Sequence, residues 1–439
     1  MKKGIVGFVV GVIILGTAVY AGSLLNSSDV SYKDTTVKEA LDSLFEKTVN
    51  NYNSEGIYEE ALLNGAIPNI TGDLVPVTID NDGTVHKANL KSEWYSYENK
   101  VWANAVILKT STEYADGATI PENNIDSYFV WIPRYKYKLW NTGTAIKTAH
   151  SIEIVFEDKE TRVSNGSNNG EYLTHPAFTN FNVNGLWVGK FETTGGTTDI
   201  DVKPNQTPLT NQNVLTFFNL GYNYNRNLDS HMMKNTEWGA VAYLSHSKYG
   251  IDREVNINNS YPMITGSSAL PSTDQHTVPG TYGAGSNYYA AYNTEIGYLA
   301  STTGNISGVY DMSGGAWEYM AAYMSGQMGS SGFTTSTISS YSKYFDIYSS
   351  SSTVTTYNYR ILGDSTGEMG PFKAYLDGDN NSRDHNSWYA DYSYFVDSSN
   401  PWFFRGGGYN GGVLAGQFFF GRATGGADSN GGFRLVLAK

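Results

Sequence analysis

Short apolar runs separated by glycine, asparagine and proline dominate the chain from residue 66 onward. Their length and their alternation with polar residues predict strands rather than helices. Asp82-Gly83 lies between two such runs and is typical of a hairpin turn. The strands expected from this pattern cover residues 75–79, 84–88, 102–109, 128–133, 186–192, 417–420 and 433–437.

Helical spacing of apolar residues occurs in fewer places, at 34–46, 209–220 and 234–244. In the first, Thr36 and Glu39 form a capping box. In the last, we expect Asn235 or Thr236 as the N-cap and Trp238 on the buried face. A helix as short as 34–46 needs a partner for its apolar stripe, which is either its own domain or a second copy of the chain. Strands and helices together predict an α+β fold.

The first 22 residues carry Lys2 and Lys3 and then an uncharged stretch from Gly4 to Gly22. This pattern predicts a transmembrane helix that orients the remainder outward. A cleaved signal segment is the alternative, because Val19-Tyr20-Ala21 also suits a cleavage site. We therefore expect a membrane-anchored protein at the cell surface, with a secreted protein as the alternative.

Composition narrows the functional classes. The net charge is -13, which argues against a nucleic-acid partner because no basic patch is present to neutralise phosphates. The chain has no cysteine, which excludes disulfides, thiolate catalysis and cysteine-bound zinc. Its seven histidines are scattered without metal-binding spacing, and no G-x-S-x-G nucleophile motif occurs. We expect a protein that is not an enzyme.

The C-terminal segment has an unusual composition. Between Phe403 and Arg434 it contains no Lys, Glu, Met or Pro, and it is rich in Gly, Tyr, Phe and Asn. This is the composition of binding loops, where rigid aromatic rings supply contact area and small polar residues supply adaptable hydrogen bonds. Composition alone is equally compatible with a plain closing hairpin of a β-rich domain.

Several motifs resemble the formylglycine-generating-enzyme (sulfatase-modifying factor) family, a variant of the C-type lectin fold. Residues 186–192 are similar to its "GkyEVTn" strand, and 234–244 to its "PTEAEWEYAA" helix. Residues 308–319 are similar to "GLYDMxGNVWEW", and Arg405-Gly406-Gly407-Gly408 with 432–436 to "RGGSW…GFR". The resemblance implies a C-type-lectin-like domain. The oxidase activity of that family needs a cysteine pair, which this chain lacks.

These elements predict four parts: a membrane anchor or signal segment (1–22), a short helical stalk (23–50), a β-rich N-terminal part (51–180) and a C-type-lectin-like ligand-binding domain (181–439). The domain's end, about 402–434, resembles the variable region of proteins encoded with diversity-generating retroelements. Such elements mutate template adenines, and an asparagine codon treated in this way never becomes Lys, Glu, Met or Trp. The segment 403–434 obeys this restriction except at Gln417.

The resemblance implies a hypervariable ligand face on an inert scaffold. The expected ligand-binding residues are Tyr409, Asn410, Val413, Leu414, Phe419, Gly421, Arg422, Asp428 and Asn430. The expected scaffold residues are Arg405, Gly406, Gly407, Trp317, Phe433 and Arg434.

Calcium is the one cofactor that the sequence suggests. Asp377, Asp379 and Asn381 alternate side-chain oxygens within a turn, as calcium ligands do, although Asx residues also fold such turns without an ion. In the resembled family the Asn and Glu of "GNVWEW" bind calcium. This chain has Glu318 but carries Gly315 where the Asn would stand.

The expected function is therefore ligand binding at the cell surface, with an extracellular protein or glycan as partner and homo-oligomerisation left open. The alternative is a fixed-specificity lectin or adhesin, or a phage receptor-binding protein. The EPN, QPD and WND motifs of calcium-dependent lectins are absent from the sequence.

Overall fold

This computed structural model describes residues 31–32, 35–36, 52–53, 55–60, 67–139, 151–160, 165–166, 168, 170–270, 288–348, 357–358, 372–373 and 387–439. The chain divides into two compact units, Met1–Asn64 and Gly65–Lys439. In the first unit, β1 (Ser31–Tyr32) pairs antiparallel with β2 (Thr35–Thr36). The expected anchor at 1–22 and residues 37–46 of the expected stalk helix lie outside the described residues.

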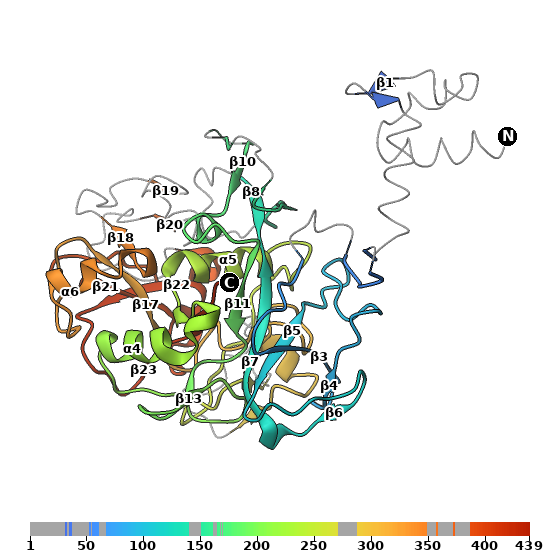
Figure 1. Ribbon diagram of the computed structural model, residues 1–439. Helices are drawn as coiled ribbons and strands as arrows, with labels where there is room; N and C mark the ends of the chain where they lie inside the picture. The colour runs from blue at the N-terminus through green and yellow to red at the C-terminus, as the bar shows by residue number, and fades with distance from the viewer. Residues whose placement is uncertain are drawn as a thin grey trace. The chain divides into compact units, whose positions relative to one another are not determined.

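The second unit contains an eight-stranded sheet (Figure 1). All of its pairings are antiparallel. In spatial order its strands are β14 (His231–Met232), β24 (Leu435–Leu437), β11 (Gly185–Gly189), β7 (Ile125–Pro133), β5 (Asn104–Leu108), β3 (Leu74–Ile79), β4 (Val85–Lys87) and β6 (Thr119–Ile120).

Strand β7 lies at the centre of this sheet. Val130 is opposite Asn104 of β5 on one side and opposite Val188 of β11 on the other. Eight of the nine residues of β7 are buried, because elements cover both faces. The sheet thus joins strands from the expected N-terminal part to strands from the expected ligand-binding domain, and its hydrogen bonds cross the expected boundary at residue 180.

A second, five-stranded sheet carries the C-terminal segment. Strand β17 pairs antiparallel with β21 and parallel with β18 and β23, and β22 pairs antiparallel with β21. The strands are β17 (Trp317–Met324), β18 (Asp346–Tyr348), β21 (Trp402–Gly406), β22 (Gly416–Ala423) and β23 (Gly431–Gly432).

Helix α5 (Asn235–Ser245) lies between the two sheets and contacts β7, β17 and β22 (Figure 1). All eleven of its residues are buried. Its N-cap is Lys234 rather than the expected Asn235 or Thr236, and the Lys234 backbone N–H donates to the Glu237 carboxylate at 2.8 Å. Asp346 of β18 accepts from the Thr236 N–H at 2.8 Å, which places a negative charge at the positive end of the helix.

Helix α4 (Val214–Tyr224) begins later than expected because the Asn213 side chain caps it, accepting from the Thr216 N–H at 2.9 Å. The third described α-helix is α6 (Thr335–Ser339). The remaining strands form small sheets: β8 (Tyr135–Lys138) with β9 (Ile154–Phe156) and β10 (Tyr172–Thr174), β12 (Thr194–Gly195) with β13 (Ile200–Asp201), β15 (Ser268–Ala269) with β16 (Tyr289–Ala290), and β19 (Tyr357–Asn358) with β20 (Phe372–Lys373).

The expected α+β fold class is wrong. The described residues form mostly β-sheet, and their longest α-helices have eleven residues. Within the described ranges, no helix has the length and apolar character needed to cross a membrane. The physical reason is that the glycine- and asparagine-rich sequence between the strands forms turns and loops rather than helices.

Candidate functional site

The C-terminal segment forms a hairpin on the second sheet. Strand β21 pairs with β22 so that Phe404 is opposite Gly421 and Arg405 is opposite Phe420. Beyond β22, the backbone of residues 392–394 extends the sheet: the Tyr394 N–H donates to the Phe420 carbonyl at 2.9 Å, and the Phe420 N–H donates to the Tyr392 carbonyl at 3.1 Å. The hairpin is therefore hydrogen-bonded along both of its edges.

Arg405 fixes the inner side of this hairpin. It is fully buried, and its guanidinium donates to the Asn235 side chain at 2.9 Å and to the Gln417 carbonyl at 3.2 Å. The same carbonyl accepts from the Trp238 indole N–H at 2.8 Å. The Gln417 side chain in turn donates to the Ser245 hydroxyl at 3.0 Å. Strand β22 is thus attached to helix α5 by several buried hydrogen bonds.

Arg434 performs the same task where the chain leaves the segment. Its guanidinium donates twice to Glu318, at 3.0 and 2.5 Å, and also to the carbonyls of Gly189 at 2.9 Å and Tyr310 at 3.0 Å. Both side chains of this ion pair are fully buried. Planar, bidentate pairs of this kind have a defined geometry, so the ion pair orients β17 relative to β11.

Two more carboxyl groups, Glu192 and Asp311, lie in the same buried region. Burial, together with the charges of Asp311 and Glu318, raises the pKa of Glu192 well above its ordinary value. Burial also raises the pKa of Asp311. One Glu192 oxygen accepts from the Ala316 N–H at 2.9 Å, and the other has no partner among the described residues. Three buried carboxyl groups, Glu192, Asp311 and Glu318, therefore lie near one arginine, Arg434.

Consecutive glycines turn the chain at the end of β21. Gly406 and Gly407 have φ of 80° and 74°, values that side-chain-bearing residues rarely adopt. A Cβ on Gly407 would lie 2.8 Å from the Ala415 Cα and 3.3 Å from the Phe419 ring. The turn therefore requires glycine for two independent reasons. We call Glu318, Arg405, Gly406, Gly407, Phe433 and Arg434 the buried frame.

The outer side of the sheet carries a row of aromatic rings. Ring centroids are 4.5 Å apart for Trp317 and Phe404, 5.6 Å for Phe404 and Phe419, and 5.4 Å for Phe419 and Tyr392. Trp317 and Tyr392, at the two ends, are partly exposed, whereas Phe404 and Phe419 are 7% and 8% exposed. We call these four residues the aromatic row. Its ends offer ring surface to a partner, and its middle is packed in place.

Two loops border this row, and we call residues 408–414 and 424–430 the rim. The Tyr409 N–H donates to the Gly315 carbonyl at 2.7 Å, and the Trp317 N–H donates to the Asn430 carbonyl at 3.0 Å. Both loops are therefore hydrogen-bonded to the same three-residue stretch, 315–317. Segments that are twenty residues apart in sequence meet around Trp317.

The nine expected ligand-binding residues fall into distinct environments. Asn410 is exposed, and Tyr409, Leu414, Arg422, Asp428 and Asn430 are partly exposed. Phe419 and Gly421 are buried, and a Cβ on Gly421 would lie 2.5 Å from the Phe404 ring. The side chain of Val413 lies outside the described part of the structure.

Arg422 lies apart from the rim. Its guanidinium forms an ion pair with Asp397 and stacks on the Tyr394 ring, 3.6 Å from the ring centroid. The expected scaffold residues Arg405, Gly406, Gly407, Phe433 and Arg434 are all buried, and Trp317 is partly exposed in the aromatic row.

Sequence reasoning missed part of this surface. Tyr392 and Tyr394 precede the expected variable region, yet they lie against β22. Tyr261 is 55% exposed, and its ring centroid lies 5.6 Å from that of Tyr409. The alternation of Tyr392 and Tyr394 was a usable sign of an edge strand. Nothing local in the sequence marks Tyr261.

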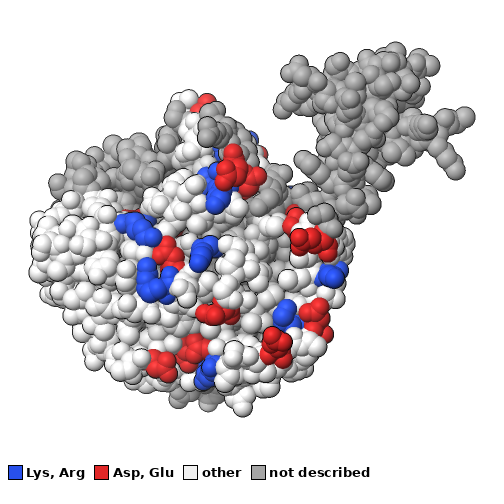
Figure 2. Space-filling view, viewed as in Figure 1, with Lys and Arg blue, Asp and Glu red and all other residues white. Residues whose placement is uncertain are grey.

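Neither charge nor metal chemistry dominates the described surface. Acidic and basic side chains are scattered over a mostly uncharged area on the face shown in Figure 2. Within the described ranges, no group of three or more His, Asp or Glu residues could hold a metal ion. Glu318 is bonded to Arg434, and a side chain at Gly315 would lie 2.4 Å from a Glu192 oxygen. The expected calcium ligands Asp377, Asp379 and Asn381 lie outside the described residues.

Comparisons with known proteins add little to this geometry. No family model and no curated protein matches the chain, so the resemblance to the formylglycine-generating-enzyme family rests on the sequence motifs alone. Among solved structures, the protein is similar to one described as "Major Tropism Determinant I1 Variant". The identity is 13%, the alignment covers 84% of this chain and 73% of that chain, and the TM-score is 0.28. A TM-score this low establishes no shared fold.

Proposed function

We propose that the protein is a non-catalytic binding protein that recognises a receptor outside the cell through the rim and the aromatic row. One observation supports this proposal above the others: loops distant in sequence are hydrogen-bonded to the same stretch, 315–317, around a partly exposed tryptophan. A tryptophan at the centre of a contact surface, bordered by small polar residues, is the usual arrangement of a binding hot spot.

The buried carboxyl groups support a non-catalytic role. Groups with strongly shifted pKa values are candidates for catalysis when they open into a cleft. Glu192 and Glu318 are fully buried, and Asp311 is 1% exposed, so no substrate reaches them. Glu318 of β17 instead accepts from Arg434, which also donates to Gly189 at the end of β11, and Glu192 accepts from the Ala316 N–H.

The same surface supports a finer proposal, that the rim is the part diversified by a retroelement. Side chains at Tyr409, Asn410, Leu414, Asp428 and Asn430 have access to solvent and can change without moving the sheet. Phe419 and Gly421 are packed against Phe404, so we propose that they are constant. A fixed receptor-binding protein would use the same surface with one sequence.

The binding proposal is tested with the labelled full-length protein on a panel of bacterial cell envelopes and on a glycan array. The test variant combines Tyr409→Ala, Asn410→Ala and Asp428→Ala. Its matched control carries Lys91→Ala, Thr112→Ala and Glu113→Ala, three exposed positions elsewhere. We expect at least a tenfold loss of binding for the rim variant and none for the control. Equal binding by both variants would refute the proposal.

Diversification has a separate test that needs only neighbouring DNA. If the rim is diversified, a reverse transcriptase gene and a template repeat lie near the coding gene. The template repeat then differs from the coding repeat only at template adenines, and the differences fall on codons for rim residues. If such a repeat is absent, or if its differences fall on codons 404, 419 and 421, the finer proposal fails while receptor binding stands.

A further inference from the structure

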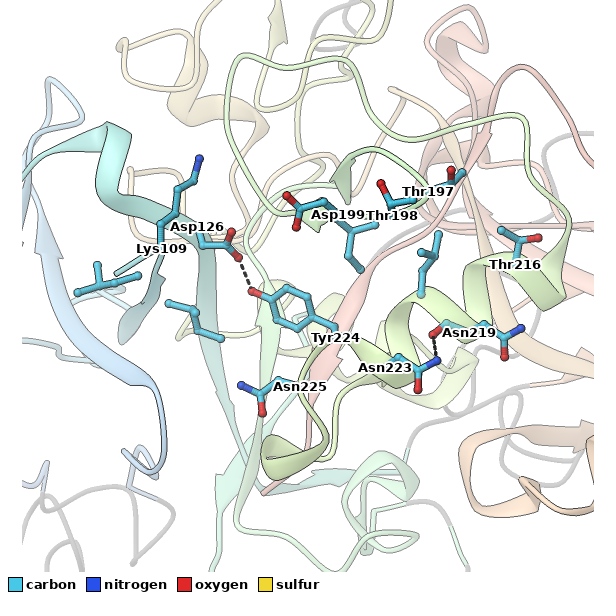
Figure 3. A pocket seen from close by; sticks show the side chains of 14 residues that line it. Lys109, Asp126, Thr197, Thr198, Asp199, Thr216, Asn219, Asn223, Tyr224 and Asn225 are labelled. Carbon is cyan, nitrogen blue, oxygen red and sulfur yellow. Dashed lines mark hydrogen bonds between the residues drawn. The ribbon is translucent and has the colours of Figure 1, made fainter. Parts of the chain in front are cut away.

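A polar crevice lies beside helix α4 (Figure 3). Its volume is about 590 Å³, and its walls are the helix, the turn between β12 and β13, and the adjoining ends of β5 and β7. This size is within the range of about 300–1,000 Å³ typical of small-molecule sites. None of the groups that form the rim or the aromatic row lines it.

Helix α4 turns its polar side toward the crevice. Thr216, Asn219 and Asn223 follow one another at helical spacing and all line the cavity, whereas Phe217 and Phe218 are buried on the opposite side. The Asn223 amide donates to the Asn219 carbonyl at 2.9 Å, which orients its side chain along the helix surface. The helix thus presents amide and hydroxyl groups, which both donate and accept hydrogen bonds.

The facing wall supplies a positioned carboxylate. One oxygen of Asp126 accepts from the Tyr224 hydroxyl at 2.8 Å and from the Ser127 hydroxyl at 3.0 Å. Burial and the Asp126 charge raise the pKa of Tyr224 well above its ordinary value, so its hydroxyl remains a donor. With one oxygen held in this way, the other is directed to accept from a ligand. Figure 3 shows Asp126 and Tyr224 linked at the side of the crevice.

The composition of the lining identifies the class of ligand. A fixed carboxylate and several amides suit a molecule with many hydroxyl groups, and the side chains of Leu108, Ile200 and Leu220 add apolar surface for its C–H groups. The lining contains two carboxylates, Asp126 and Asp199, and one lysine, Lys109. Its net charge is therefore negative and would repel an anionic ligand. We propose that this crevice binds a neutral saccharide.

The proposal is independent of the rim and is tested on the full-length protein. The probe is an array of neutral and sialylated oligosaccharides, followed by titration calorimetry with the best neutral ligand. The test variant is Asn219→Leu, which places a bulky apolar side chain on the exposed helix surface. Its control is Asn227→Leu, an exposed asparagine just beyond the helix and outside the crevice.

We expect wild type, Asn227→Leu and Tyr409→Ala to bind the neutral saccharide equally and Asn219→Leu to lose at least tenfold in affinity. Asp126→Asn, which keeps an acceptor for the Tyr224 hydroxyl, should weaken binding as well. No binding of any neutral saccharide by wild type, binding of sialylated saccharides alone, or equal binding by Asn219→Leu would each overturn the proposal. A loss with Tyr409→Ala and not with Asn219→Leu would assign the saccharide to the rim and overturn it too.

Discussion

The buried frame and the rim belong to one short segment of sequence but have opposite physical character. In the frame, Arg405 and Arg434 are fully buried, and each makes several hydrogen bonds to other elements. In the rim, Asn410 is exposed, and the chain is held mainly by backbone hydrogen bonds of its turns. The frame therefore determines where the surface lies, and the rim determines what the surface presents.

This difference teaches that glycine and aromatic residues have different structural roles at different positions of the segment. Glycine at 407 is required by φ and by packing, whereas Gly412 has a positive φ but no atom within 4 Å of an added Cβ. Phe404 is packed in the row, and Tyr409 is partly exposed. The comparison predicts four graded effects.

The largest effect is expected for Arg434→Met. It leaves Glu318 buried without its partner beside Asp311, and removal of one partner of a buried ion pair costs about 3–5 kcal/mol. Arg422→Met is the matched control, because its pair with Asp397 is partly exposed, and it should cost less than about 1 kcal/mol. Urea denaturation of both variants measures the difference. Similar losses for the two would contradict the assignment of Arg434 to the frame.

Next comes Gly407→Ala compared with Gly412→Ala. Both substitutions place a side chain at a positive φ, which costs roughly 1 kcal/mol. Only Gly407→Ala also brings a methyl group against Ala415 and Phe419. We expect about 3 kcal/mol for Gly407→Ala. Thermal unfolding of the two variants is the measurement, and a larger loss at Gly412 would contradict the assignment of Gly407 to the frame.

The third prediction concerns Glu192, a buried carboxyl group beside Glu318 and Arg434 of the frame. Because the folded-state pKa of Glu192 is raised above its ordinary value of 4.5, its contribution to stability is complete below that value and is lost as pH rises. Glu192→Gln mimics the protonated acid and keeps an acceptor for the Ala316 N–H. It should therefore gain stability relative to wild type as the pH rises from 5 to 8.

Chemical denaturation at both pH values measures this gain. A constant difference between Glu192→Gln and wild type would show that Glu192 is ionised in the folded protein.

The smallest effect is expected in the rim. Tyr409→Ser and Asn410→Ala remove partly exposed or exposed side chains, so each should change the free energy of unfolding by no more than about 0.5 kcal/mol. A calorimetric scan of each variant is sufficient. A loss above about 2 kcal/mol for either would place that side chain in the frame.

Local sequence predicted the parts of this site that local forces determine. The strands at 417–420 and 433–437, the glycine turn after Arg405 and the buried helix around Trp238 all follow from periodicity and turn chemistry. The pairing of β7 with β11 and of β17 with β21 joins residues far apart in the chain, and side-chain patterns do not specify such partners. For the same reason Tyr392 was not foreseen beside Phe419, nor the crevice beside α4.

The central claim is that residues 402–434 consist of a fixed frame and an exchangeable rim. The most direct test is a saturation library over these residues, displayed on cells and sorted for protease resistance. The account predicts that substitutions are tolerated at 408–414 and 424–430, apart from glycines with positive φ, and rejected at 402–407, 416–421 and 431–434. Equal tolerance along the whole segment, or tolerance at Arg405, Phe419 and Arg434, would contradict it.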